Sequence, residues 1–354
     1  MTGVSHAGPA KVAFLSNHGT MGGGEVMLVA MAAASDGVPA QVVGPAAPND
    51  VAVECARLGL PYVDVGGTSR ISYLRRLRHW AASVRGGAPP LLWCNGATPS
   101  LATAGLRVPR VVHLHHPPPP SQQLPLAYAR RNARATVVPS LSMSRLVRSS
   151  VVLENWTADF ELDAGRSGAV SEGRTFTVGY LGRLSLAKGI DVLAEAVRNL
   201  RRDEPPIHFV VAGDYRFVSR AQRQGIAESL EDLSTDVDLV GWIPRQDLFD
   251  QVDALVVPSS DPEPFGLSAA EAMAVGVPVL VSNAGALPEV VGPDHPWVFP
   301  AGDATALASS LRQLRDDGGR RQASRLAARH RWEERYSPAA GTGRFQDLLS
   351  GLLS

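Results

Sequence analysis

Short apolar runs alternate with helical segments along the whole chain. The apolar runs have the length of buried strands, and they lie at 11–16, 41–44, 61–65, 91–94, 110–115 and 136–140, and again at 177–182, 208–213, 237–242, 254–258 and 277–281. Segments with helical periodicity separate many of them, as at 71–84 and 190–201. Strands that alternate with helices form parallel sheets covered by helices on both faces. The sequence therefore predicts an α/β fold of doubly wound parallel sheets.

The alternation lapses once, near the middle of the 354 residues. Residues 163–174 (DAGRSGAVSEGR) are small, polar and charged, which is typical of a linker. At about 100–200 residues per domain, the length predicts two domains. We place them at 1–160 and 161–354, with the last helix able to cross back to the first domain. Two doubly wound domains in tandem favour a ligand-binding cleft at the carboxyl ends of their strands.

Composition narrows the classes of function. The 34 Lys+Arg and 34 Asp+Glu residues cancel, which argues against a dedicated nucleic-acid binder. No apolar run approaches the roughly 18 residues that span a bilayer, and the first residues do not resemble a signal peptide. Cys55 and Cys94 have no metal-ligand spacing and cannot form a disulfide framework. We therefore expect a cytoplasmic protein without bound metal.

Two acids and a tight turn follow the predicted strand at 254–258. In Glu263-Pro-Phe-Gly-Leu-Ser-Ala-Ala-Glu271, proline and glycine predict a turn into a helix that begins near Phe265. The unpaired N–H groups of a helix start favour a phosphate, and carboxylates accept hydrogen bonds from sugar hydroxyls. A bare pair of glutamates would more often be solvated surface acids, but the Pro-Phe-Gly turn favours a binding site.

Two cations follow the predicted strand at 177–182. Arg183 and Lys188 lie in Gly182-Arg-Leu-Ser-Leu-Ala-Lys-Gly189, between this strand and the helix at 190–201. Only Lys11 and Lys188 are lysines among the 34 basic residues, so a lysine here is not explained by composition. Two cations at a helix start predict a diphosphate site, whereas the alternative is a solvated basic loop.

Together these two segments resemble those of the retaining glycosyltransferases of family 4, which have the GT-B fold of two Rossmann-like domains. The resemblance covers nearly the whole chain. It implies a nucleoside diphosphate sugar as donor, bound mainly by the C-terminal domain, and an acceptor bound mainly by the N-terminal domain. It gives Arg183 and Lys188 the donor diphosphate, Glu271 the ribose, and Glu263 the transferred sugar together with a catalytic role.

The same resemblance implies further donor contacts in the C-terminal domain. The backbone amides of Phe265, Gly266 and Leu267 would hold phosphate. Ile243, within Gly241-Trp-Ile-Pro244, would touch the base, and the segment 282–289 would close the donor pocket. No cofactor and no catalytic metal are expected, because positive side chains neutralise the leaving diphosphate.

The N-terminal half carries two weaker matches to the family. Gly22-Gly-Gly-Glu25 resembles a Gly-Gly-x-Glu motif, which would give Gly22 and Gly23 a contact with the donor phosphates. The alternative is a tight strand-to-helix turn. The family often carries a histidine at the end of the strand predicted at 110–115, and His115 fits this catalytic position best.

The neighbouring histidines leave the register of this match open. His113 and His116 lie beside His115, and His116 stands where many members have aspartate. The alternative for these side chains is core packing or a contact with the acceptor.

Two remaining patterns suggest less. Asp236-Val-Asp238 matches the metal-binding pair of the other large glycosyltransferase fold, but it directly precedes a predicted strand, and we interpret the match as coincidence.

The helix at 71–84 has apolar positions on one side and arginines mainly elsewhere. A basic amphipathic helix can contact an anionic membrane weakly, although an ordinary Rossmann helix with a solvated face is the alternative. Residues 1–165 are net +5 and residues 166–354 net −5, which adds support to the membrane hypothesis.

The resemblance predicts an enzyme, a retaining glycosyltransferase that uses a UDP- or GDP-sugar and a small polar natural-product or sugar acceptor with a free hydroxyl. A glycolipid or polysaccharide acceptor at the membrane surface is the alternative within this class. A non-catalytic nucleotide-sugar-binding protein is the alternative outside it. An epimerase or a pyridoxal-phosphate-dependent phosphorylase on the same fold is a further alternative, but Lys188 is badly placed for a Schiff base.

Overall fold

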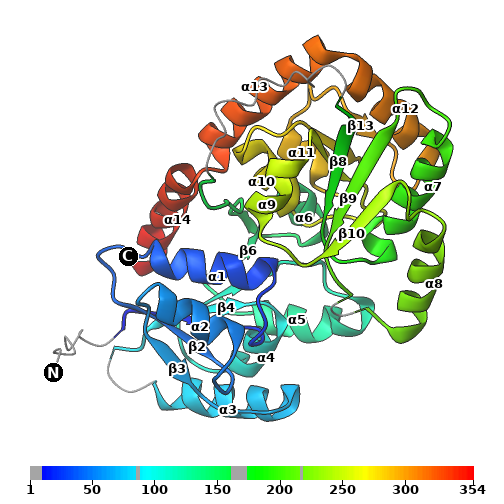
Figure 1. The fold of residues 1–354 in the computed structure, drawn as a ribbon. Coiled ribbons are helices and arrows are strands. Elements are labelled where there is room, and N and C mark those ends of the chain that lie inside the picture. Colours follow the sequence, from blue (N-terminus) through cyan, green and yellow to red (C-terminus); the bar gives the residue numbers. More distant parts are fainter. Residues whose placement is uncertain (1–9, 85–87, 161–173, 216–217) are drawn as a thin grey trace, which may run out of the picture. The chain divides into compact units, whose positions relative to one another are not determined.

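The computed structural model describes residues 10–84, 88–160, 174–215 and 218–354. The chain divides into two compact units, each built around one parallel sheet (Figure 1). Unit 1 comprises Met1–Asn155 together with Gly341–Ser354, and unit 2 comprises Trp156–Ala340. The predicted α/β class with two Rossmann-like sheets is confirmed.

The sheet of unit 1 has the strand order β3-β2-β1-β4-β5-β6-β7, and all its pairs are parallel. Its strands are β1 (Val12–Leu15), β2 (Ala40–Gly44), β3 (Tyr62–Asp64), β4 (Leu91–Asn95), β5 (Arg110–His113), β6 (Ala135–Val138) and β7 (Val151–Val152). Its helices are α1 (Gly23–Ala33), α2 (Asp50–Arg57), α3 (Arg70–Ser83), α4 (Ala97–Thr103), α5 (Gln123–Arg130), α6 (Leu141–Leu146) and α14 (Pro338–Leu353). The order reverses between β1 and β4, which is the switch point at which doubly wound sheets bind ligands.

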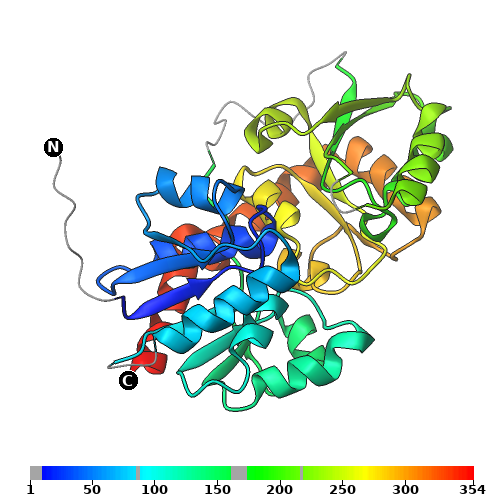
Figure 2. The ribbon, with the colours of Figure 1, turned by 90° about the horizontal axis from the view of Figure 1, so that it is seen from below.

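Successive residues of a strand point to opposite faces, so the buried strands of unit 1 pack against two helical layers. Ala13 and Leu15 of β1 share a core with α3 and α4. Phe14, between them, instead packs its ring 6.2 Å from that of Phe345 in α14, and Trp93 of β4 lies 5.5 Å from the same ring. The last helix therefore completes the second face of this sheet. Figure 2 shows the same unit turned by 90°.

The sheet of unit 2 repeats the arrangement with the order β10-β9-β8-β11-β12-β13. Its strands are β8 (Phe176–Leu181), β9 (Ile207–Ala212), β10 (Val237–Gly241), β11 (Ala254–Val257), β12 (Val279–Ser282) and β13 (Val298–Phe299). Its helices are α7 (Ile190–Leu200), α8 (Arg220–Glu231), α9 (Arg245–Gln251), α10 (Leu267–Ala274), α11 (Leu287–Val291), α12 (Ala304–Asp316) and α13 (Gly318–Arg335), with the short 3-10 turn η2 (Leu186–Lys188) before α7. One face carries α7, α8 and α12, and the other carries α9, α10, α11 and α13.

Every predicted strand exists, but one boundary and several helices were mispredicted. The strand predicted at 110–115 ends at His113, so His115 lies beyond it. Helices α4, α5, α6, α8 and α11 were missed, and α14 was expected only as a last helix of unspecified bounds. Proline within α4 and three glycines within α14 lower intrinsic helix propensity, and packing on the sheets overrides it.

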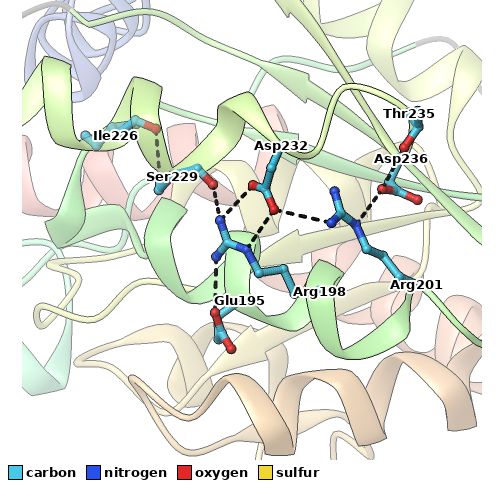
Figure 3. A network of polar contacts seen from close by, with 8 residues as sticks. All are labelled: Glu195, Arg198, Arg201, Ile226, Ser229, Asp232, Thr235 and Asp236. Atoms are coloured by element: carbon cyan, nitrogen blue, oxygen red, sulfur yellow. Dashed lines mark hydrogen bonds and ion pairs between the residues drawn. The ribbon is translucent and has the colours of Figure 1, made fainter.

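Arginines of α7 tie this helix to the end of α8 and to the start of β10 (Figure 3). Arg198 donates to Asp232 at 3.0 Å, and the Nε of Arg201 donates to Asp236 at 3.0 Å. Asp238 pairs with the imidazole of His208 at 2.9 Å. Both carboxylates of the Asp-Val-Asp segment are thus engaged by side chains of the protein, Arg201 and His208. The pairs are at least partly exposed to solvent, where each contributes at most about 1 kcal/mol.

The helices show no candidate for a membrane span: among the described residues, none is both long enough and apolar enough.

The close approach of η2 to the end of β11 predicts a position that requires glycine. Gly189 has φ +69°, and a Cβ there would lie 1.8 Å from the Pro258 carbonyl oxygen. We expect Gly189→Ala to lower the free energy of unfolding by about 2 kcal/mol or more, measured by urea denaturation. The matched control is Gly225→Ala in exposed α8, where no atom lies within 4 Å. That change should raise stability by about 0.5–1 kcal/mol. Equal urea midpoints for the two variants would contradict the packing described here.

Candidate functional site

The carboxyl ends of β8 and β11 adjoin each other at the switch point of unit 2, and the predicted cations and acids follow these two strands. The backbone joins the two segments directly. The N–H groups of Ser260 and Asp261 both donate to the carbonyl oxygen of Ala187, each at 3.1 Å. Because Ala187 precedes Lys188, these bonds bring the lysine to the segment that contains Glu263.

Lys188 and Glu263 form an ion pair, with Nζ and Oε1 2.5 Å apart. The Ser259 hydroxyl donates to the same carboxylate oxygen at 2.6 Å. The Glu263 side chain is buried and the Lys188 side chain is half-buried. A buried carboxylate needs such partners, because an unpaired charge away from water is strongly unfavourable.

The backbone of Glu263 is fixed as well. Its carbonyl oxygen accepts from the N–H of Ala286 at 2.9 Å. Gly285, with φ +62°, passes so close that a Cβ would lie 2.4 Å from the same oxygen. Segment 282–289, predicted to close the donor pocket, therefore lies directly against Glu263.

Arg183 lies apart from this pair. Its side chain is exposed, and its carbonyl oxygen accepts from the Tyr180 hydroxyl at 2.6 Å. Within the part of the chain that the structure describes, the guanidinium makes no ion pair. Ser185, between the two cations, is buried, and its hydroxyl has no hydrogen-bond partner among the described residues. Sequence reasoning missed this serine, although its place between the cations was visible.

The helix predicted from Phe265 begins two residues later, at Leu267, with Gly266 as its N-cap at φ +109°. The side chain of Phe265, whose backbone amide is predicted to hold phosphate, packs in the core with its ring 5.4 Å from that of Tyr336, edge to face. The N–H groups of Ala269 and Ala270 both donate to the Gly266 carbonyl oxygen. The first turn of α10 therefore leaves the amides of Leu267 and its neighbours for a ligand, as helix geometry requires.

Glu271 lies in the second turn of α10 and meets a residue that the sequence analysis did not identify. Its Oε1 is 2.9 Å from the Nε of Arg245, the first residue of α9. Burial raises the pKa of Glu271 to about 7, although Arg245 opposes the shift. Ile243, two residues before Arg245, is half-buried against the same core. In the sequence, the only indication of a role for Arg245 is its position directly after the Gly-Trp-Ile-Pro segment.

In unit 1, the predicted glycine turn leads from β1 into α1, which begins at Gly23 with Gly22 as an extended N-cap. Glu25 in the first turn is buried, and burial raises its pKa to about 8. Its carboxyl oxygen is 3.5 Å from the Nε2 of His18. Asn95, at the end of β4, also hydrogen-bonds to Glu25. A carboxyl with this pKa is mostly protonated at neutral pH.

Asn95 also sets the protonation of His115. Its Nδ2 donates to the Gly24 carbonyl oxygen at 3.0 Å, so its Oδ1 is the acceptor that lies 2.6 Å from Nε2 of His115. Nε2 therefore carries the proton, and Nδ1 presents a lone pair that has no partner among the described residues. Burial and the neighbouring His113 lower the pKa of His115, which keeps the ring neutral. A Cβ at Gly24 would lie 2.9 Å from this ring.

The other two histidines occupy different environments. His113 is fully buried, accepts from Trp93 Nε1 at 3.2 Å, and has its pKa lowered to about 3 by burial. His116 is exposed. The sequence alone could not distinguish the three, whereas the structure brings only His115 against the glycine turn that contains Gly24.

Comparisons with known proteins agree with this architecture. Residues 166–331 match the family model described as glycosyl transferases group 1. The amylovoran biosynthesis glycosyltransferase AmsK of Erwinia amylovora is 30% identical over 181 residues, which cover 48% of this chain and 43% of AmsK. A D-inositol 3-phosphate glycosyltransferase of Corynebacterium urealyticum is 31% identical over 169 residues, 44% of this chain and 40% of that protein. The matched segments thus span less than half of these relatives.

Solved structures match over almost the whole chain. HepE of Anabaena, in complex with UDP and glucose, has a TM-score of 0.81 at 19% identity, covering 97% of this chain and 100% of HepE. Sucrose-phosphate synthase of Thermosynechococcus elongatus has a TM-score of 0.77 at 20% identity, covering 97% and 99%. The chain thus resembles GT-B glycosyltransferases, and its fold is GT-B.

The buried Glu25 predicts a pH dependence of stability. Its pKa in the folded state, about 8, lies above the ordinary value of 4.5 for a glutamate, so the folded protein retains a proton that the unfolded chain loses between these pH values. Its contribution to stability therefore falls as pH rises from about 4.5 to 8, by about 2–5 kcal/mol. Glu25→Gln should remove this fall.

The measurement is urea unfolding at pH 5 and pH 8, compared between wild type and variant. Glu54→Gln, at an exposed helical pair with Arg57, is the control and should keep the wild-type pH dependence over this range. A parallel pH profile for Glu25→Gln and wild type would show that Glu25 is ionised in the folded protein.

Proposed function

We propose that this chain is a retaining glycosyltransferase that moves a sugar from a nucleoside diphosphate sugar to a hydroxyl acceptor. The observation that carries the proposal is the assembly at the ends of β8 and β11. There, Lys188 is paired with the buried Glu263, next to the first turn of α10, and Glu271 follows in the second turn. The family match over residues 166–331 covers this assembly.

In the proposed site, the donor diphosphate binds Lys188, Arg183 and the free amides at Gly266 and Leu267. A diphosphate is a stronger partner for Lys188 than one carboxylate, because it carries more charge and several acceptor oxygens. The hydroxyl of Ser185 can supply a further donor. Glu271 accepts from the ribose hydroxyls, and Arg245 favours its ionised form by partly opposing the rise in pKa that burial causes. Ile243 provides an apolar contact for the base.

The chemical step proceeds at the anomeric carbon on the side of the leaving group. The bond from this carbon to the phosphate oxygen breaks, the bond to the acceptor oxygen forms, and the acceptor proton passes to the departing phosphate oxygen. Cations and helix amides stabilise the negative charge that develops on the diphosphate. Glu263 binds hydroxyls of the transferred sugar and favours the positive charge that develops on its ring. The configuration of the anomeric carbon is retained.

For the donor we propose a UDP-sugar, with a GDP-sugar as the alternative. HepE, which shares the fold, has been solved with UDP-glucose. For the acceptor we propose a small polar or sugar molecule. The resemblance also assigns Gly22, Gly23 and His115 of unit 1 to the donor phosphates and the sugar. The neutral His115, with its free Nδ1, can accept a hydrogen bond from a sugar hydroxyl.

Nucleotide binding tests the diphosphate site. We expect UDP at about 100 times its Kd to add roughly 2.7 kcal/mol of stability, visible as a rise in Tm, and Lys188→Ala to abolish most of this rise. Lys11→Ala is the matched control, because Lys11 is the only other lysine and lies exposed before β1. No Tm rise with UDP or GDP, or equal rises in both variants, would overturn the site.

Turnover tests the role of Glu263. Glu263→Gln preserves its size but removes the charge, and we expect release of UDP from UDP-glucose to slow by about 10²-fold or more. Glu228→Gln, on exposed α8, is the control and should keep wild-type turnover. Bound UDP with no turnover in wild type would favour a nucleotide-sugar-binding protein instead. Nuclear magnetic resonance of the product then reports whether the anomeric configuration is retained.

A further inference from the structure

A long stretch of unit 1 contains arginines but no acid. Between Asp64 and Glu154 the sequence has no aspartate or glutamate, whereas it has 12 arginines. Opposite charges are normally interspersed on protein surfaces. This stretch encodes the helices α3, α4, α5 and α6 and the strands β4, β5, β6 and β7.

The topology gathers these helices on one face of the sheet. Leu77 of α3 and Ala102 of α4 share one core cluster, and Ala104, Leu126 of α5 and Met143 of α6 share the next. Right-handed crossovers place the helices that follow the reversal of strand order on the same side. Figure 1 shows α3 on the opposite side of β2 and β3 from α1. The helical layer α3–α6, which we call the arginine layer, is therefore free of carboxylates.

One end of the arginine layer also exposes large apolar side chains. Leu124 and Tyr128, one turn apart on α5, are 84% and 56% exposed, and Leu146 at the end of α6 is 60% exposed. The exposed arginines Arg145 and Arg148 flank Leu146. Several large apolar side chains exposed on helices that share one core cluster are typical of a contact surface.

Several other arginines of the layer serve the fold. The buried Arg110 donates to three carbonyl oxygens, those of Thr103, Ala129 and Arg131, and Arg78 donates to those of Ala102 and Ala104. Helix α3, the amphipathic segment noted in the sequence, directs Leu77 and Ala81 into the core. Helix α3 also exposes Ile71 beside the exposed Arg70 and Arg75, but it exposes only this one large apolar side chain among its described residues. Helices α5 and α6 expose more, namely Leu124, Tyr128, Leu141 and Leu146.

We propose that the α5–α6 end of the arginine layer docks this protein on an anionic lipid surface. Leu124, Tyr128 and Leu146 enter the boundary between headgroups and acyl chains, while Arg145 and Arg148 bind the lipid phosphates. A soluble polyanion would explain the arginines, but it would leave the exposed leucines without a role. The surface belongs to unit 1, whereas the ends of β8 and β11 belong to unit 2, and the docking proposal does not depend on the proposed transferase activity.

Co-sedimentation of the full chain with phosphatidylcholine vesicles, with and without phosphatidylglycerol, tests the proposal in the absence of any sugar nucleotide. We expect binding to the anionic vesicles only, weakened by salt. Arg145→Ser with Arg148→Ser should weaken it roughly 10- to 30-fold, since each arginine near the surface contributes about 1 kcal/mol. Leu124→Ser with Leu146→Ser should weaken it by about tenfold or more.

Matched pairs on exposed sites elsewhere control for general effects. Arg202→Ser with Arg220→Ser removes equal charge from unit 2, and Val53→Ser with Leu326→Ser removes exposed apolar side chains from α2 and α13. Both controls should bind as wild type does. The proposal is overturned if wild type ignores the anionic vesicles or if the controls lose binding equally. It is also overturned if the leucine pair binds normally, because the surface then recognises charge alone.

Discussion

The ion pair of Lys188 with Glu263 depends on a close passage of backbone at the switch point of unit 2. Glu263 is buried, and a buried carboxylate is stable only with its partners in place. The carboxylate partners come from separate segments, Lys188 from η2 and Ser259 from the end of β11. The N–H of Ala286, in the loop after β12, fixes the backbone of Glu263 by donating to its carbonyl oxygen. The segments approach this closely because glycine stands at 189 and 285, where a side chain would clash with backbone. These close backbone contacts therefore position Lys188 and Glu263, which are proposed to bind the donor.

At the switch point of unit 1, the polar side chains are held by neutral hydrogen bonds and not by an ion pair. There burial favours the neutral forms of Glu25 and His115, and the amide of Asn95 links the two side chains. The amide has a fixed orientation because its Nδ2 is committed to the Gly24 carbonyl oxygen. A side chain far from Glu25 and His115 in sequence thereby sets the tautomer of the histidine. The resulting site offers a hydrogen-bond acceptor without a charge, which suits a sugar hydroxyl better than an anion.

The topology of unit 1 also places an acid-free segment of the sequence on one side of the sheet. The absence of acids between Asp64 and Glu154 would not produce a basic surface if the helices of this segment covered both faces of the sheet. In the observed strand order, every helix of that run lies in one layer, and the acidic residues of α1, α2 and α14 belong to the rest of unit 1. The two-residue strand β7 at the edge of the sheet was not predicted from the sequence, yet it places α6 at the end of this layer.

The sequence by itself determined the two parallel sheets, because short apolar runs that alternate with helical segments are typical of strands buried between two helical layers. It also identified Lys188, Glu263 and Glu271, since cations and acids after strands reach the same sheet edge. Only the tertiary structure brought Arg245 to Glu271 and Asn95 to His115, because these contacts join residues 26 and 20 positions apart through backbone paths that no local pattern encodes. The end of β5 at His113 and the start of α10 at Leu267 were likewise decided by hydrogen bonding and packing, not by composition.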